Sequence, residues 1–349
     1  MPRKAGRFAS ETQRLIRSWM RHEPAMLRDY LVRDVEDPRL NVQSILARHF
    51  LIGRLLPGRF GPLMDEELRF AVAMNWLLAE AKRPEAAARL PALHMALLDG
   101  ADSAEGRPIP AYVRETFARL PREVDGAAVP DFLGDALLWP PAEGNEARLP
   151  VGPLSTFQRL WRQALAAESA PPVSVLEIAC GSANDFRFLD AYGIARHLDY
   201  TGIDLCEANV RNAAAMFPAA RFSVANALEL PFPDKSFDLC FVHDLFEHLS
   251  VAAMEQALAE LGRVTRKAAA LGFFRMHPGA RHIMRRVEAY HLNTLSTPAT
   301  ASFLRRQGAR VRIVPIDRFL RVRFGCADTH NTAAHTLLVQ FHRPGRAVC

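Results

Sequence analysis

The sequence predicts an α/β fold, in which a seven-stranded, mostly parallel sheet follows an all-helical N-terminal part. Two observations support this prediction. From about residue 157 onward, short apolar runs alternate with amphipathic stretches, which is the pattern of strands and crossover helices in a parallel sheet. Before residue 148, apolar residues recur at helical spacing and no alternating, β-rich stretch occurs.

The N-terminal part is expected to consist of amphipathic helices. The strongest pattern covers Glu66–Lys82 and ends before Pro84. The stretch Trp139–Pro150 opens with Trp139-Pro140-Pro141 and continues with scattered Gly, Asn and Pro, which is typical of a linker. We therefore divide the chain into a helical domain, residues 1–148, and a second domain, residues 149–349. The other helices expected in the first domain are Thr12–Val35, Val42–Leu56, Ala86–Leu98, Ala111–Leu120 and Phe132–Leu138.

The second domain is expected to begin with a helix from Thr156 and then to alternate strands and helices. Its last strand follows a long irregular stretch rather than a clear helix, so this strand is the one that we allow to enter antiparallel. The expected strands are 173–178, 199–203, 221–225, 237–242, 268–275, 309–315 and 335–342, and the clearest helices between them are Asp185–Tyr192, Asn209–Phe217, Val251–Arg266 and Pro298–Gln307.

The charge of the chain is uneven along its length. The 349 residues carry a formal net charge of +6, but the segment from Arg263 to the end contains 16 Lys and Arg against three acids. That segment is therefore at +13 and residues 1–262 are at −7. Such asymmetry indicates either an anionic partner or a solvated, arginine-rich surface, and the sequence leaves both open.

Several classes of protein are not expected from the composition. No apolar run approaches the ~20 residues that span a bilayer, and the basic first residues lead into no signal-peptide core. The five cysteines are scattered and lack C-x-x-C spacing, which argues against a disulfide framework and against a zinc site. We expect a cytoplasmic protein without a bound metal.

One stretch organises the second domain. Val173–Ile178 is an apolar run that predicts a buried parallel strand, and it ends in the small residues Gly181, Ser182 and Ala183. Small residues at such a strand–helix junction let the backbone approach a ligand closely. Glu177 lies near the end of the strand, where a buried carboxylate requires a partner, and a ligand ammonium group is one.

Further polar signals follow where the next strands end. Asp204 ends the second strand, about one βα unit after the glycine turn, where an acid can accept both hydroxyls of an adenosine ribose. Asn226 follows the third strand, and its amide can pair with an adenine edge. A proline-set turn, Leu230–Leu239, leads into the fourth strand, which ends in His243-Asp244-Leu245-Phe246-Glu247-His248-Leu249.

These four motifs, in this order and spacing, resemble the class I, Rossmann-like methyltransferases that use S-adenosylmethionine (SAM). The nearest resemblance is to the broad small-molecule branch that includes the quinone-biosynthesis C-methyltransferases. It covers residues of about 157–342, and nothing in residues 1–148 resembles a known family. Two positions depart from the family pattern: Ala183 replaces the usual second glycine and Asn226 replaces the usual aspartate. A NAD dehydrogenase would share the glycine turn and Asp204 but would not need the segment from Leu230 to His248.

The resemblance implies roles for individual residues. Glu177 would hold the methionine ammonium group, Gly181 and its neighbours would offer backbone to the methionine moiety, and Asp204 would bind the ribose. Residues near the adenine and the sulfonium would complete the site, so that the full cofactor set is Glu177, Ala179, Gly181, Ser182, Ala183, Asp204, Leu205, Asn226, Ala227, Leu228 and His243.

Methyl transfer from a sulfonium is an in-line displacement, and a base is needed only if the acceptor must lose a proton. His243 lies where the fourth strand ends and is expected to face the acceptor. Tyr290-His291 resembles a loop segment that lies over the acceptor in related enzymes. The catalytic candidates are His243, Asp244, Tyr290 and His291, with Glu247, His248 and His277 as further possible bases.

The expected function is methylation of O, N or C of a small molecule, with the helical domain as a cap over the acceptor. An anionic acceptor is a further hypothesis. The anionic acceptor is suggested by Arg281, Arg285 and Arg286, the first two of which would share a face if they lay on a helix. Other uses of the same fold stay open: a SAM-dependent intramolecular cyclisation, a nucleic-acid methyltransferase, which we regard as unlikely, and a SAM-binding protein without turnover. The acceptor and the oligomeric state do not follow from the sequence.

Overall fold

The computed structural model describes residues 38–119 (without 82, 84–88, 90, 91, 94 and 98), 122–129 (without 125 and 126), 155–287, 290–326 and 332–341. The helices expected at Thr12–Val35 and Phe132–Leu138 and the linker at 139–150 lie outside these residues. Among the described residues, no helix is long and apolar enough to cross a membrane.

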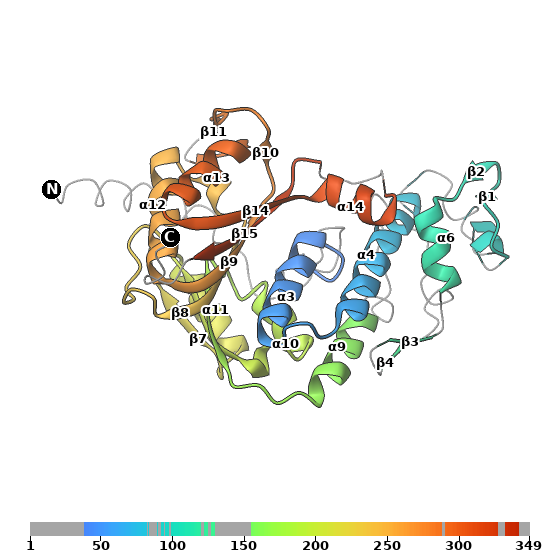
Figure 1. The fold of residues 1–349 in the computed structure, drawn as a ribbon, viewed down its shortest axis with the longest axis horizontal. Helices are drawn as coiled ribbons and strands as arrows, with labels where there is room; N and C mark the ends of the chain where they lie inside the picture. The colour runs from blue at the N-terminus through green and yellow to red at the C-terminus, as the bar shows by residue number, and fades with distance from the viewer. Residues whose placement is uncertain are drawn as a thin grey trace, which may run out of the picture.

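A seven-stranded sheet forms the centre of the second domain, as the sequence predicts (Figure 1). The strand order is β14-β15-β9-β8-β5-β6-β7. Only β15 runs antiparallel to its neighbours, so the last strand enters as the sequence allowed. The strands are β5 (Val173–Ile178), β6 (Leu198–Asp204), β7 (Arg221–Val224), β8 (Phe237–His243), β9 (Thr265–Phe273), β14 (Ala309–Pro315) and β15 (His335–Phe341).

Each face of the sheet packs on its own set of helices, because successive strand residues point to opposite faces. Val175 on β5 faces a core shared with the N-terminal helices, whereas Leu176 and Ile178 face a second core. The second core is closed by α12 (Val251–Val264) and α13 (Thr297–Arg306). Helix α9 (Thr156–Ala166) precedes the first strand of the sheet. The other crossover elements are α10 (Phe186–Ala191), α11 (Glu207–Met216) and the short 3-10 helix η1 (Ala195–His197).

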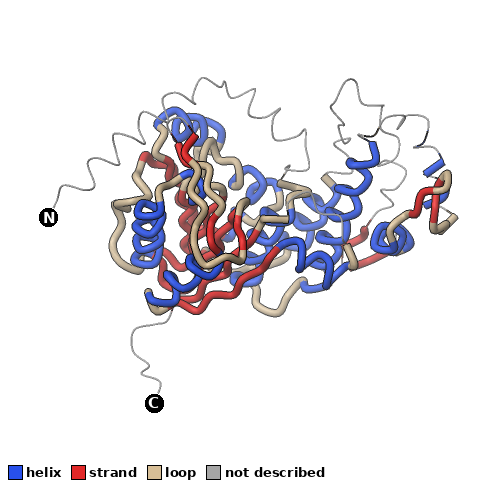
Figure 2. The backbone as a smooth tube through the Cα atoms, turned by 90° about the horizontal axis from the view of Figure 1, so that it is seen from above, coloured by secondary structure: helices blue, strands red, loops and turns tan. Residues whose placement is uncertain are grey.

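The N-terminal helices α3 (Val42–Leu55) and α4 (Gly61–Ala81) pack directly against the sheet domain and share its core. The buried amide of Gln43 donates to the carbonyl of Phe273, at 3.0 Å, and to the carbonyl of His335, at 2.9 Å. These carbonyls lie at the carboxyl end of β9 and the start of β15. Helix α3 is therefore fixed at the edge of the sheet where its parallel strands end, and α4 lies on its far side (Figures 1 and 2).

A buried ion pair joins these helices to the domain that follows. Glu67 on α4 is fully buried and accepts from Arg48 at 2.8 Å, from His49 at 2.7 Å and from the Trp161 indole of α9 at 2.6 Å. The Arg48 guanidinium also lies over the ring of Tyr192, 4.2 Å from its centroid. Burial alone would raise the pKa of Glu67, but Arg48 and His49 lower it to about 2. The N-terminal helices and the sheet domain are thus held together by paired charges as well as by apolar packing.

The N-terminal part differs from the all-helical expectation in two short hairpins. Strands β1 (Ser103–Ala104) and β2 (Arg107–Pro108) pair around Glu105-Gly106, and both turn residues have positive φ, 49° and 74°. That conformation fits a two-residue type I′ turn, for which Glu-Gly is a weaker signal than Asn-Gly. Strands β3 (Arg122–Val124) and β4 (Ala127–Val129) flank Asp125-Gly126, a turn signal in the sequence that the helical periodicity around it obscured. Helix α6 (Ala111–Ala118) lies between the hairpins.

The stretch before the last strand is also corrected by the structure. It contains helix α14 (Ile316–Phe324) rather than only irregular chain. The helix buries Ile316, Leu320 and Phe324, which are four residues apart and so lie on one face. It ends at Gly325, whose φ of 68° is the usual left-handed C-cap. The signal was present in the sequence but was masked by the arginines between these apolar positions.

Replacing Glu67 should lower the stability of the whole chain. In Glu67→Gln the buried guanidinium of Arg48 loses its counter-charge, so the free energy of unfolding at neutral pH should fall by about 3 kcal/mol. Because the folded pKa lies below the unfolded value, this loss should shrink as the pH falls from about 4.5 toward about 2. Urea denaturation, with the exposed Glu207→Gln as control, measures the difference; an equal midpoint for both variants would refute the structural role of the pair.

Candidate active site at the carboxyl ends of the strands

The turn after β5 has an unusual backbone. Ala179, Gly181 and Ala183 all adopt positive φ, of 62°, 56° and 65°. Only glycine does so without strain, and an alanine in this region costs about 1 kcal/mol or more. Two alanines therefore stand where glycine would be unstrained, and the turn carries strain at the place where a ligand is expected to meet the backbone.

Asp204, at the end of β6, holds this turn. One carboxylate oxygen accepts from the Gly181 N–H at 2.9 Å, and the other accepts from the Cys206 N–H at 2.8 Å and from the Asn209 amide at 3.3 Å. The sequence placed Asp204 and Gly181 in one site, and the structure brings them into direct contact. Ser182 hydrogen-bonds Asn209 at 2.9 Å, which ties the same turn to α11.

Glu177 is buried beside the turn, and the hydroxyl of Tyr200 donates to its carboxylate through a short hydrogen bond. A side chain at Gly202 would meet that hydroxyl at 2.7 Å, so the glycine is needed for the pair to form. Burial raises the pKa of Glu177 well above its usual value, and the nearby carboxylates of Asp185 and Asp204 raise it further, against the bond from Tyr200. The side chain therefore lacks a positive partner among the described residues.

His243 and Asp185 form a second feature of the site. His243 ends β8, and its Nδ1 lies 2.8 Å from a carboxylate oxygen of Asp185, which directly precedes α10. The Nε2 atom is buried and has no hydrogen-bond partner among the described residues. Burial would lower the pKa of His243, but the charge of Asp185 outweighs it and raises the pKa. A Cβ at Gly272 on β9 would lie 2.3 Å from the imidazole, so the ring occupies space that only glycine leaves.

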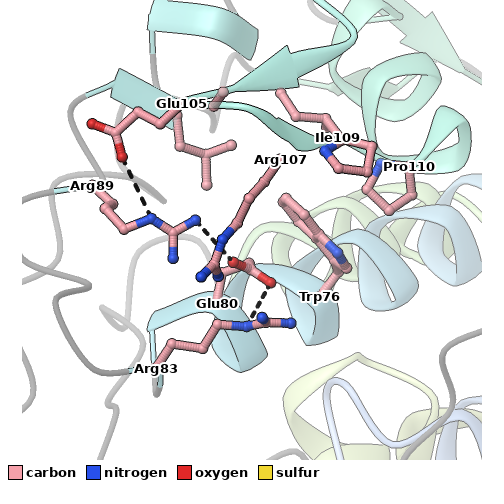
Figure 3. A pocket seen from close by; sticks show the side chains of 11 residues that line it. Trp76, Glu80, Arg83, Arg89, Glu105, Arg107, Ile109 and Pro110 are labelled. Carbon is pink, nitrogen blue, oxygen red and sulfur yellow. Dashed lines mark ion pairs between the residues drawn. The ribbon is translucent and has the colours of Figure 1, made fainter.

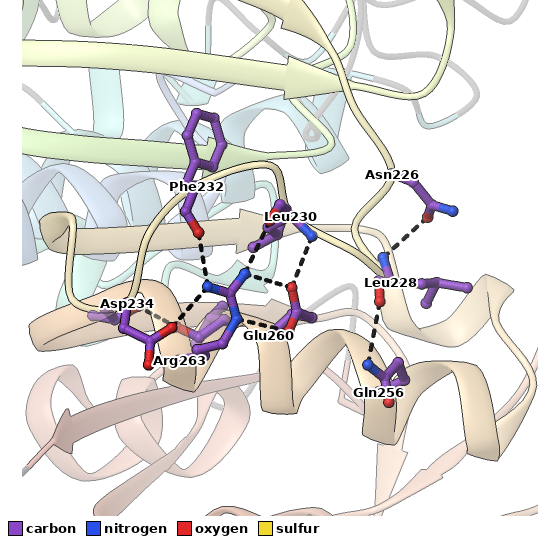
Figure 4. Close-up of polar contacts among 10 residues, drawn as sticks. Asn226, Leu228, Leu230, Phe232, Asp234, Gln256, Glu260 and Arg263 are labelled. Carbon is purple, nitrogen blue, oxygen red and sulfur yellow. Dashed lines mark hydrogen bonds and ion pairs between the residues drawn. The ribbon is translucent and has the colours of Figure 1, made fainter. Parts of the chain in front are cut away.

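The loop after β7 is held by one arginine (Figure 4). The Arg263 guanidinium of α12 donates to the carbonyls of Phe232 at 2.7 Å and Leu230 at 2.9 Å, and pairs with Glu260 at 2.7 Å and Asp234 at 3.0 Å. The carboxylates of Glu260 and Asp234 raise the pKa of Arg263 above its usual range. In the described contacts, the Leu-Pro-Phe-Pro-Asp signature therefore serves to hold the loop in place through Arg263. The sequence did not reveal Arg263 because this residue lies about 30 residues downstream of the loop.

The expected adenine-side residues lie at the start of this loop. Asn226 accepts from the Leu228 N–H at 3.0 Å through its side-chain oxygen, which forms a local turn. Its amide nitrogen makes no such bond among the described residues. Leu205, Ala227 and Leu228 are half-buried near the ends of β6 and β7.

A separate cluster surrounds the 3-10 helix η2 (Phe246–His248). His248 contacts Asp244 at 3.1 Å and the His291 carbonyl at 3.2 Å, and the Tyr290 ring lies beside it, 6.0 Å between centroids. Tyr290 and His291 form the short strand β12, which pairs with β11 (Arg286–Val287). The described contacts thus join Asp244, Tyr290 and His291 to His248 rather than to His243.

Glu247 anchors the loop that follows β9. Its Oε1 accepts from the N–H groups of Phe274 at 2.6 Å and Arg275 at 3.3 Å, and its carbonyl accepts from the Asn293 N–H at 2.9 Å. Strands β10 (Met276–His277) and β13 (Leu295–Ser296) pair across the same loop. Burial, aided by Asp244, raises the pKa of Glu247 to about 7.

The loop corrects one detail of the anionic-acceptor hypothesis. Arg281 and Arg285 were considered as neighbours on a helix, but this segment is a loop with short bridges in which Ile283 pairs with Thr294. Proline and glycine at 278–279 and the pairing with 290–294 prevent a helix from forming here. Both arginines are exposed and make no ion pair among the described residues.

The chain was compared with known proteins. Residues 176–273 match the sequence model of the family described as a methyltransferase domain. This segment is a methyltransferase domain. The match and the four motifs together identify this segment as a SAM-dependent methyltransferase domain of class I, with S-adenosylmethionine as its cofactor, which confirms the resemblance. The match is to the domain family as a whole and does not single out the quinone-biosynthesis branch.

Similar solved structures cover about half of the chain. A SAM-dependent methyltransferase from Methanosarcina mazei is 16% identical, with a TM-score of 0.38 over 49% of this chain and 92% of that one. Magnesium protoporphyrin IX methyltransferase from Synechocystis, solved with SAM, is 13% identical, with a TM-score of 0.36 over 52% and 75%. The 1,6-didemethyltoxoflavin-N1-methyltransferase of Burkholderia thailandensis is 18% identical, with a TM-score of 0.37 over 53% and 78%. A search of curated proteins finds no match.

Sequence reasoning missed three residues of this methyltransferase site. Asp185 was treated only as the start of a helix, although it follows the glycine turn by two residues. Tyr200 and Arg263 form hydrogen bonds with residues that are distant in the sequence, and no local sequence pattern predicts such contacts. For Asp185, the sequence offered one signal, which was its carboxylate two residues after a turn that is expected to bind a ligand.

The raised pKa of Glu247 predicts a pH-dependent stability. Between about 4.5 and about 7 the folded state binds a proton that the unfolded state has lost, so the free energy of unfolding should fall as the pH rises through this window, by up to about 3 kcal/mol. Glu247→Gln keeps an oxygen for Phe274 and Arg275 but carries no charge, so its stability should change less over the same window. Thermal unfolding at about pH 5 and about pH 8 measures this, with the exposed Glu115→Gln as control. If the thermal midpoint changed equally between the two pH values in all three proteins, the assignment to Glu247 would be disproved.

Proposed function

We propose that this methyltransferase acts on a small molecule whose accepting atom loses a proton, and that His243 takes that proton. The observation that carries the proposal is the Asp185–His243 pair. The Nε2 atom of His243 is buried at the carboxyl edge of the sheet and has no hydrogen-bond partner among the described residues. A general base needs an acceptor atom directed at the reacting group and a partner that stabilises its charged form. The free Nε2 and the Asp185 carboxylate supply these two features.

The residues around the glycine turn suit a positively charged cofactor. Glu177, Asp185 and Asp204 place three carboxylates near one turn, which favours an ammonium and a sulfonium and disfavours the pyrophosphate of a dinucleotide. We assign Glu177 to the ammonium group and Asp204 to the ribose hydroxyls. The backbone of Ala179, Gly181, Ser182 and Ala183 would line the methionine moiety, and the adenine would lie against Leu205, Asn226, Ala227 and Leu228.

When bound, SAM supplies a methyl group already activated on a sulfonium. The chain then has to place the acceptor in line with that methyl group and remove one proton from it. His243 accepts the proton at Nε2, and Asp185 stabilises the imidazolium that results. His243 must be neutral beforehand, so the pKa that Asp185 raises sets the lower limit of the active pH range.

The N-terminal helices are proposed to cover the acceptor. Gln43 fixes α3 at the carboxyl end of β9, next to β8 and His243. Acceptor specificity would then reside largely in a part of the chain that resembles no known family.

We extend the proposal to an anionic acceptor. The loop that carries Arg281 and Arg285 begins directly after β9 and is exposed. Guanidinium groups suit a carboxylate or phosphate, which they can bind in a bidentate manner. The excess of basic residues from Arg263 onward also favours a negatively charged acceptor.

The base assignment predicts a pH profile. In the wild type, kcat for the true acceptor should rise with pH through a pKa above the usual histidine value of about 6.5. Asp185→Asn removes the anion that raises this pKa, so the rise should move to lower pH while kcat falls by about tenfold or more. His243→Gln should lose the pH dependence together with at least a hundredfold of kcat.

The controls separate this mechanism from its alternatives. Asp190→Asn changes an exposed acid on the same helix and should leave the profile unchanged. Product analysis should give S-adenosylhomocysteine, whereas methylthioadenosine would indicate cyclisation of the cofactor itself. A wild-type profile that is flat in the histidine range, or one that Asp185→Asn leaves in place, would eliminate His243 as the base.

A further inference from the structure

A cavity of about 390 Å³ lies in the N-terminal part, between the end of α4, the β1–β2 hairpin and the start of α6 (Figure 3). Its volume is within the range of small-molecule sites. Leu93 and Ile109 are buried in its wall, and the half-buried indole of Trp76 adds a flat aromatic surface. The apolar part of the cavity therefore suits a flat, apolar ligand body.

Among the described residues that line the cavity, the charged side chains have an excess of one positive charge. Three arginines and two glutamates line it. Glu80 lies 2.9 Å from Arg83 and 3.8 Å from Arg89, and Arg89 lies 3.4 Å from Glu105. Both carboxylates are thus already engaged with these two guanidinium groups, and Arg89 holds its partners only at long distances.

Arg107 is the remaining cation. Its side chain extends from β2 toward Trp76 and Glu80 (Figure 3). It makes no hydrogen bond or ion pair among the described residues. An unpaired guanidinium beside an indole presents a bidentate donor and a stacking surface together, which are the features that recognise an aromatic acid.

We propose that this cavity is a second ligand site, which binds a small aromatic carboxylate. The single unbalanced positive charge matches a ligand with one negative charge. A phosphate dianion would be repelled by the carboxylates of Glu80 and Glu105, and the described lining offers no second unpaired cation to compensate its second charge. The indole of Trp76 would stack on the aromatic ring of the ligand, and the guanidinium of Arg107 would bind its carboxylate in a bidentate manner.

The site is separate from the methyltransferase site. Helices α3 and α4 lie between the hairpin and the sheet, and the hairpin with α6 forms the end of the molecule remote from the sheet (Figures 1 and 2). A ligand in this cavity does not reach His243. Its binding is therefore independent of the proposed base chemistry and of SAM.

Calorimetry with 2-naphthoate as the probe tests the proposal on the full chain. The wild type should bind it, and saturating SAM should leave the affinity unchanged. Arg107→Gln should weaken binding by tenfold or more, since a charge-assisted pair is lost. Trp76→Ala should also weaken it. Arg211→Gln, the same change at a highly exposed arginine on α11, should have no effect.

Analogues of the probe separate the contribution of its negative charge from that of its aromatic ring. The neutral 2-naphthalenemethanol should bind at least tenfold more weakly than the carboxylate. Circular dichroism and the thermal midpoint verify that each variant is folded. The proposal is overturned if 2-naphthoate does not bind, if Arg107→Gln binds it as the wild type does, or if SAM displaces it. Tighter binding of 2-naphthyl phosphate than of 2-naphthoate would overturn the carboxylate assignment.

Discussion

Three carboxylates, those of Glu177, Asp185 and Asp204, meet around one strained turn, and the site depends on how each is compensated. Asp204 is satisfied by backbone N–H groups, and Asp185 by His243. Burial would raise the pKa of Asp185, but His243 and the more remote guanidinium of Arg48 hold it below its usual value. Among the described residues, the side chain of Glu177 has only the hydroxyl of Tyr200 as a partner, so it is the carboxylate that a cationic ligand would complete.

The need to compensate these buried carboxylates also ties the N-terminal helices to the site, so the helices are not an independent module. Arg48 lies on α3, pairs with the buried Glu67 of α4 and stacks on Tyr192, the residue that ends α10. Asp185 directly precedes the same helix. The N-terminal helices therefore carry a charge that acts on one of the three carboxylates, because the guanidinium of Arg48 contributes to lowering the pKa of Asp185.

The sequence predicted the sheet, its crossover helices and the positions of Glu177, Gly181, Asp204 and His243, because each depends on a local pattern. Apolar runs set the strands, and ligand residues follow where parallel strands end. The partners of these residues were not predictable in the same way. Tyr200 reaches Glu177 only because Gly202 leaves room, and Arg263 holds its loop across about 30 residues. Helix α14 and the β1–β2 hairpin were missed because their signals, an i, i+4 apolar face among arginines and a Glu-Gly turn, were weak.

We propose that Glu177 ionises when the cofactor binds, and one measurement tests this directly. Calorimetric titration of SAM at mildly acidic pH, in two buffers of different ionisation enthalpy, counts the protons released on binding. Because the pKa of buried Glu177 is raised and an ammonium partner would lower it, binding should release a proton from the wild type. Glu177→Gln should bind SAM more weakly and lose that release. Binding enthalpies that do not depend on the buffer, or a release that Glu177→Gln retains, would contradict the account.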